Sequence, residues 1–86
     1  KARRLSVVQP RLTSTLLRQT PATVVVIFIV DENGRVQDPK VQRTTNPSFD
    51  RSALAAIKQW KFEPAKVQGR AVSSRLRQSF SFENNT

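Results

Sequence analysis

The sequence predicts an α+β fold in which a three-stranded antiparallel sheet has one or two helices packed on one face. Three stretches carry this prediction: an apolar run from Val24 to Val30, an amphipathic stretch over residues 49–60, and an alternating stretch from Val72 to Phe82. The apolar faces of the strands and the apolar stripe of the helix can bury one another. With 86 residues the chain makes one domain, near the lower limit for a core that folds without cross-links.

The first 22 residues form a basic segment, and we expect the main domain to span residues 23–86. Leu12 and Leu16 have helical spacing, and Thr13 or Ser14 can cap the first turn. This spacing predicts a short helix that ends before the next proline. The chain begins at Lys1 rather than at a methionine, so we expect it to be a piece of a longer protein.

The first strand of the sheet is expected over residues 23–30, which are rich in β-branched side chains. Asn33 and Gly34 follow, and this pair favours a hairpin because both residues tolerate positive φ. A second strand then runs from about Arg35 to Arg43, with Val36 and Val41 inward. Pro39 has no N–H to donate, so this strand should lie at an edge or carry a bulge.

The helix is expected to begin near Pro47, with either Asn46 or Ser48 as its N-cap. Its apolar stripe recurs at steps of three and four residues and consists of Phe49, Ala53, Ala56, Ile57 and Trp60. Pro64 is expected to end the helix, and Gly69 marks the next turn.

The last strand is expected from Val72 to Phe82, because apolar and polar side chains alternate there. Its polar face carries Arg75 and Arg77. This order of strand, strand, helix and strand gives the α+β fold stated above.

Composition narrows the classes of function. The chain has no cysteine and no histidine, which removes thiolate ligands and the commonest general base. Its two glycines are too few for a glycine-rich phosphate loop. The six carboxylates have no nucleophile or metal-ligating partner at a useful spacing. We therefore expect no enzyme, no cofactor and no metal site. The formal net charge of +9 favours an anionic partner, and the alternative is that it only keeps a small domain soluble.

A series of residues from position 23 onward forms a specific pattern. It comprises Val24, Val26, Phe28 and Val30; Asp31, Gly34 and Val36; Phe49, Asp50, Ala53, Leu54 and Ala56; Trp60-Lys61-Phe62-Glu63-Pro64-Ala65; and Phe80 with Phe82. This pattern resembles the C-terminal domain of the TonB family over about two thirds of the chain.

The resemblance implies a non-catalytic periplasmic domain of an energy transducer. In that family the domain follows an inner-membrane anchor and a proline-rich linker. It binds the Ton box peptide of outer-membrane TonB-dependent transporters and transmits energy from an inner-membrane proton-channel complex for nutrient uptake. We expect binding by β-augmentation, in which the peptide adds a strand to an exposed sheet edge. The first strand should be central, which leaves the last strand as a free edge.

The predicted site residues follow from this resemblance. The peptide-binding set on the last strand is Ser73, Ser74, Arg75, Leu76, Arg77, Gln78 and Ser79, joined by Gln9, Pro10 and Arg11 from the N-terminal segment. The predicted structural core is Val24, Val26, Phe28, Phe49, Ala53, Ile57, Trp60, Phe62, Phe80 and Phe82.

Two departures from the family pattern leave alternatives open. The family often has a Tyr-Pro pair ahead of its first helix, whereas this chain has Gln9-Pro10 and no tyrosine. The second face of the first strand is apolar (Val25, Ile27 and Ile29), so we expect the N-terminal segment, a second copy or a partner to cover it. One alternative is a structural or oligomerising domain without transporter coupling. Another is a basic nucleic-acid-binding domain, which we disfavour because the aromatics fall mainly at core positions.

Overall fold

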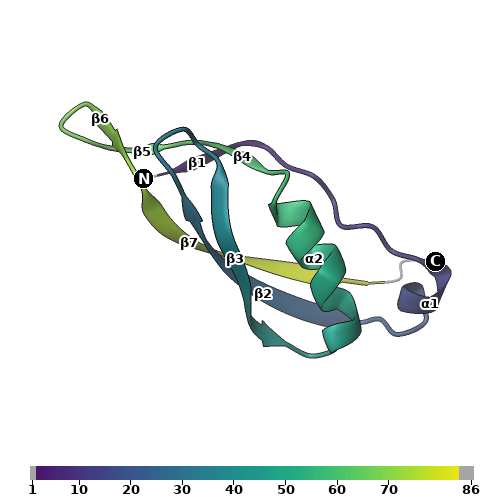
Figure 1. The fold of residues 1–86 in the computed structure, drawn as a ribbon. Helices are drawn as coiled ribbons and strands as arrows, with labels where there is room; N and C mark the ends of the chain where they lie inside the picture. Colours follow the sequence, from purple (N-terminus) through teal and green to yellow (C-terminus); the bar gives the residue numbers. More distant parts are fainter. Residues whose placement is uncertain (1, 84–86) are drawn as a thin grey trace.

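The computed structural model describes residues 2–83 of the chain. Its three-stranded antiparallel sheet has the order β3-β2-β7, and one face is covered by the helix α2 (Figure 1). The predicted α+β fold is therefore confirmed. The elements are β1 (Arg3–Ser6), α1 (Ser14–Leu17), β2 (Ala22–Val30), β3 (Val36–Thr44), the 3₁₀ turn η1 (Pro47–Phe49), α2 (Asp50–Ile57), β4 (Lys61–Glu63), β5 (Ala65–Val67), β6 (Arg70–Val72) and β7 (Ser74–Phe82).

The central strand β2 pairs with β3 through a tight turn. The Gly34 N–H donates to the Asp31 carbonyl at 3.0 Å, and Gly34 adopts a φ of +80° that glycine tolerates without strain. β3 lies at the sheet edge, and its register shifts beside Pro39, where Asp38 has a φ of 49°. Pro39 thus lies in an edge strand that also carries a bulge, as its missing N–H predicts.

The core lies between the sheet and α2. All ten apolar residues expected in the core are buried, and Val24, Val26, Phe49, Ala53 and Ile57 have no exposed surface at all. The aromatic rings contact one another, with centroid distances of 4.8 Å for Phe49 and Phe82 and 5.6 Å for Trp60 and Phe80. These rings supply much of the apolar area that a chain of this length can bury.

The helix is shorter than predicted, because it ends at Ile57 rather than at Pro64. Trp60 follows in a turn, and residues 61–63 form β4, which pairs with β1. The Phe62 N–H also donates to the Gly34 carbonyl at 3.0 Å. These partners satisfy the backbone of residues 61–63 outside a helix, so the segment leaves helical geometry before the proline is reached.

The N-terminal segment packs on the same side of the sheet as α2 (Figure 1). Its side chains Val8, Leu12 and Leu16 contact the core, and the Trp60 Nε1–H donates to the Val8 carbonyl at 2.9 Å. The predicted short helix is present, and Thr13 caps it by accepting a hydrogen bond from the Leu16 N–H at 3.2 Å. The boundary at residue 22 stays a prediction, and residues 84–86 of the predicted main domain lie outside the described residues.

The opposite face of the sheet is not covered by the N-terminal segment. Val25, Ile27 and Ile29 point away from α2, and 36% of the Ile27 surface is exposed. The expectation that residues 1–22 cover this face is therefore wrong, because Val8, Leu12 and Leu16 of this segment pack against the core on the other side. The two remaining alternatives for covering this face are a second copy of the domain and a partner protein.

Candidate functional site

The edge of the sheet formed by β7 is open along its length. β7 pairs antiparallel with β2 over nine positions without a register shift, from Ala22 opposite Phe82 to Val30 opposite Ser74. Within residues 2–83 no other strand pairs with β7. The first strand of the sheet is thus central and the last one lies at an edge, which is the geometry that strand addition requires.

The contacts of β2 show which backbone groups of β7 point outward. At one end of β2, the Thr23 carbonyl accepts from the Thr45 N–H at 3.0 Å, just beyond β3. At the other end, the Asp31 N–H donates to the Arg35 carbonyl at 2.9 Å. Both odd-numbered residues therefore direct their backbone groups toward β3. Because backbone direction alternates along a strand, the even-numbered residues of β2 bond to β7.

The same alternation then applies to β7. Each even-numbered residue of β2 lies opposite an even-numbered residue of β7, as Val26 lies opposite Gln78. The even-numbered residues of β7 are therefore bonded to β2, and the odd-numbered ones direct N–H and C=O to the open edge. The outward set is Arg75, Arg77, Ser79 and Ser81. The Ser79 carbonyl accepts from the Gln78 side-chain amide at 2.8 Å, which occupies one of these outward groups.

The side chains of β7 divide between the two faces of the sheet. Ser74, Leu76 and Gln78 lie on the α2 side and are half-buried. Arg75 and Arg77 are exposed on the other face, opposite Ile29 and Ile27. A strand added at this edge would therefore have two guanidinium groups beside it.

The structure brings together only part of the predicted peptide-binding set. Gln9 and Pro10 line a groove of about 320 Å³ together with residues 78–83, so they lie beside the C-terminal half of β7. Gln9 and Pro10 also line a second groove against α2, and Arg11 lines only this second groove, with Arg51 and Ala55. Residues 73–77 extend toward the opposite end of the strand, where Ser73 joins β6 to β7.

Ser81 was missed by the sequence prediction. Its backbone faces the open edge in the same way as that of Ser79, and it lines the groove beside Gln9 and Pro10. The alternation of the sequence continues through Phe82, so extending the odd-numbered set by one step would have included Ser81.

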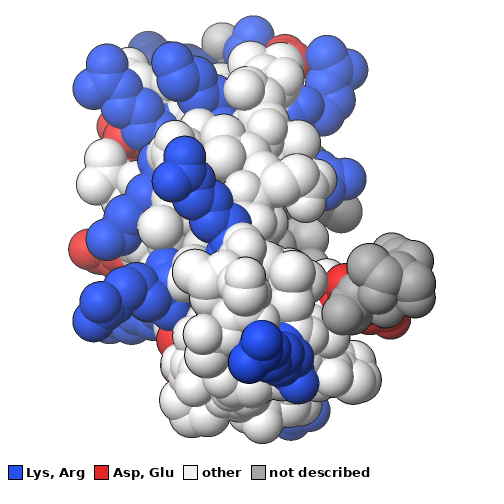
Figure 2. All heavy atoms as spheres, turned by 90° about the vertical axis from the view of Figure 1, so that its right-hand side faces the viewer, with Lys and Arg blue, Asp and Glu red and all other residues white. Residues whose placement is uncertain are grey.

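The surface is strongly cationic (Figure 2). Among residues 2–83 one ion pair is present, between Arg3 and Glu63 at 3.2 Å. Asp31 lies in the β2–β3 turn, where the Arg35 N–H and the Gln37 side chain donate to its carboxylate and lower its pKa. This shift has its cause in the turn itself, which follows Val30, the residue paired with Ser74 at the start of β7.

Other classes of site find little support in the described part of the chain. All six aromatic side chains are buried, so the sheet presents no ring on which a base could stack. Residues 2–83 contain no cluster of carboxylates that could hold a metal ion. None of the helices within this range is long and apolar enough to span a membrane.

Comparisons with known proteins agree with this architecture. "Protein TonB" from two strains of Xanthomonas campestris pv. campestris is 35% identical over 63 residues, which are 72% of this chain and 28% of each relative. The chain thus spans little more than a quarter of the length of these relatives. The solution NMR structure of the Pseudomonas aeruginosa TonB CTD matches with a TM-score of 0.82 at 24% identity, covering 99% of this chain and 88% of that one. That likeness concerns the fold. A family model described as the C-terminal of the Gram-negative bacterial TonB protein matches residues 17–83, so the chain belongs to the TonB C-terminal domain family.

Proposed function

We propose that this domain docks an extended peptide by adding it as a strand to the free edge of β7. The proposed peptide is the Ton box of an outer-membrane TonB-dependent transporter. The full-length protein would be anchored in the inner membrane, with this domain in the periplasm. It would pass energy from a proton-channel complex to the transporter for nutrient uptake. Membership of the TonB family supports the proposed cellular location and partners, and the outward backbone groups of β7 support binding by strand addition.

The open backbone ladder is the single observation that carries the proposal. Four consecutive outward positions, from Arg75 to Ser81, span about 20 Å at 3.3 Å per residue, long enough for a peptide of six or seven residues. Arg75 and Arg77 favour acidic side chains in that peptide, but each exposed ion pair contributes only about 0–1 kcal/mol. Backbone pairing should therefore supply more of the affinity than charge does.

Proline substitution can test this because the two backbone directions of β7 are distinguishable. Ser79→Pro deletes an N–H that faces the open edge, and it leaves the ladder with β2 intact. We expect this variant to stay folded and to lose most of its affinity for labelled Ton-box-like peptides. The matched control Ser79→Ala removes the hydroxyl but keeps the N–H, so it should bind like the parent.

Gln78→Pro provides the second control, because it deletes an N–H that bonds to Val26 on β2. We expect it to lower the stability of the fold, which a urea melt would show. Amide shifts of the parent on titration should follow residues 73–81. Normal peptide binding by a folded Ser79→Pro variant, or shifts restricted to β3 and the N-terminal segment, would contradict docking at β7.

A further inference from the structure

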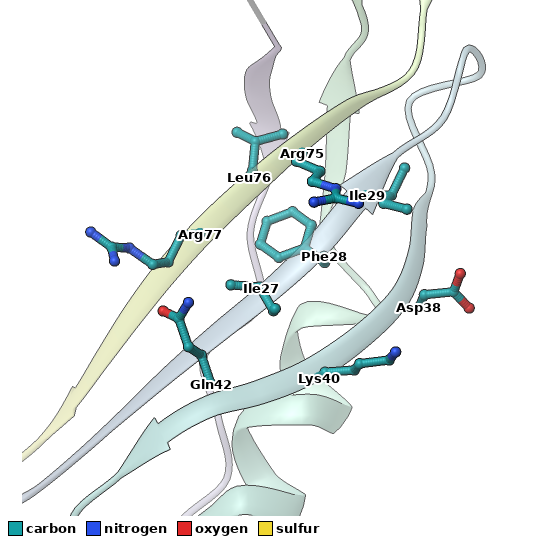
Figure 3. Close-up of a pocket in the computed structure, with 9 residues that line it drawn as sticks. All are labelled: Ile27, Phe28, Ile29, Asp38, Lys40, Gln42, Arg75, Leu76 and Arg77. Atoms are coloured by element: carbon teal, nitrogen blue, oxygen red, sulfur yellow. The ribbon is translucent and has the colours of Figure 1, made fainter.

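The face of the sheet opposite α2 carries an apolar row on its central strand. Val25, Ile27 and Ile29 alternate with the buried core residues of β2 and therefore point to the other side. Ile27 and Ile29 lie in the floor of a shallow groove of about 650 Å³ (Figure 3). A central strand that is apolar on both faces is typical of a sheet covered on both sides, yet the described residues cover only one.

Cationic side chains border this row on both neighbouring strands. Lys40 on β3 and Arg77 on β7 lie directly opposite Ile27, and residues directly opposite in a sheet share a face. Arg75 lies opposite Ile29, and Figure 3 shows its side chain reaching over β2 toward that residue. Among the described residues, Asp38 is the one carboxylate that lines the groove, and it points away from the floor in Figure 3.

The charge and shape of this groove favour some binding partners over others. A second copy using the same face would bring Lys40, Arg75 and Arg77 against themselves, because a two-fold interface is formed by identical patches. Like charges in such contact oppose association. A flat lipid surface would meet the long cationic side chains at the rim, while the isoleucines on the floor stayed out of reach. A narrow convex partner with carboxylates on both sides of an apolar ridge fits both the floor and the rim.

We propose that this groove, extended along β2 by Val25, binds an amphipathic α-helix of a protein partner, with its apolar stripe on Val25, Ile27 and Ile29 and acidic residues on both flanks. The apolar row extends about 13 Å, since it covers four residue steps of a strand. A helix covers that length in about nine residues, so apolar side chains at positions i, i+3 or i+4, and i+7 would contact the row. This site uses the face of the sheet rather than the backbone edge of β7, and the two sites share Arg75 and Arg77.

The test uses a small set of designed helical peptides about 15 residues long. Each has one leucine stripe bordered by glutamates, with the spacing of the stripe varied, and a scrambled peptide of equal composition serves as the peptide control. Isothermal titration should show binding that weakens with salt. Amide shifts should follow the odd-numbered residues of β2 and their neighbours on β3 and β7.

Two variants of the protein localise the binding. Ile27→Ser should weaken it about tenfold, because it removes the central apolar contact. Lys40→Glu should weaken it roughly three- to tenfold. Its matched control is Lys58→Glu, which changes the net charge equally at an exposed position after α2 and should bind like the parent. Neither Ile27 nor Lys40 belongs to the β7 edge, so both variants should retain Ton-box-like peptide binding if the proposed function is correct.

Several outcomes would overturn the proposal. One is that no stripe peptide binds better than the scrambled control. A second is that Lys58→Glu weakens binding as much as Lys40→Glu. A third is that vesicles of phosphatidylglycerol and phosphatidylcholine shift the Ile27 region while the peptides do not. The last is concentration-dependent sedimentation of the parent that Ile27→Ser abolishes, which would assign the face to a second copy.

Discussion

Replacing Trp60 with alanine tests how the N-terminal segment and the sheet share one core. The indole is 94% buried, meets Phe80 edge-on at 5.6 Å between centroids and donates to the Val8 carbonyl at 2.9 Å. Truncating a buried tryptophan typically costs about 3–5 kcal/mol. An 86-residue domain has a total stability of about 4–13 kcal/mol, so this loss is a large share of it.

The expected decrease in melting temperature is roughly 12–40 °C, because 1 kcal/mol corresponds to about 4–8 °C in a domain of this size. Far-UV circular dichroism should be used for the melt, since the substitution removes the only tryptophan. Trp60→Phe keeps a ring but loses the hydrogen bond to Val8, and should cost about 1–2 kcal/mol. Gln59→Ala alters an exposed neighbour and should stay within about 0.5 kcal/mol of the parent. A Trp60→Ala melt within a degree or two of the parent would refute this account of the core.

Two further predictions concern the turns. Gly34→Ala and Gly69→Ala both place a side chain at a φ near +80°, but at position 34 the new Cβ would collide with the Phe62 carbonyl, whereas position 69 has open space. Gly34→Ala should therefore be the more destabilising in urea melts, by about 1 kcal/mol or more, and equal losses would contradict the close approach. The pKa of Asp31 is lowered mainly by the hydrogen bond from the Arg35 N–H. The charged carboxylate therefore stabilises the fold at pH values above its unfolded-state pKa. This contribution is lost as the pH falls through the folded-state pKa. The stability of Asp31→Asn should depend less on pH in that acidic range, and an unchanged pH profile would show that the turn does not favour the charged form.

The sequence predicted the elements whose signals are local. The β2–β3 hairpin follows from Gly34, the bulged edge strand from Pro39, and the exposed face of β7 from alternation. The end of α2 at Ile57 had no local signal, because it depends on β1 pairing with β4 nearly 60 residues away in the chain. Tertiary pairing of this kind overrides the helical pattern that continues to Trp60.

The sequence predicts which strand forms the candidate site, but it does not predict which of that strand's backbone groups face the open edge. Alternation in the sequence separates the two faces of β7, but it does not tell which N–H groups face the open edge. That information depends on the register with β2 and on the contacts of Thr23 and Asp31 with the β3 side. The family resemblance groups Arg11 with the peptide-binding set, whereas the structure has it against α2, because packing on the core sets the direction of the N-terminal segment.

The central position of β2 has a consequence for how the chain folds. The β2–β3 hairpin closes through the short turn at Asp31–Gly34, whereas β7 must return from more than 40 residues further along the chain. Closing the longer loop costs more entropy, so the hairpin can form before β7 arrives. Until then, β2 exposes an unpaired edge with apolar side chains on both faces, a composition that promotes aggregation. The arrival of β7 is therefore the step of folding on which the solubility of the newly made chain depends.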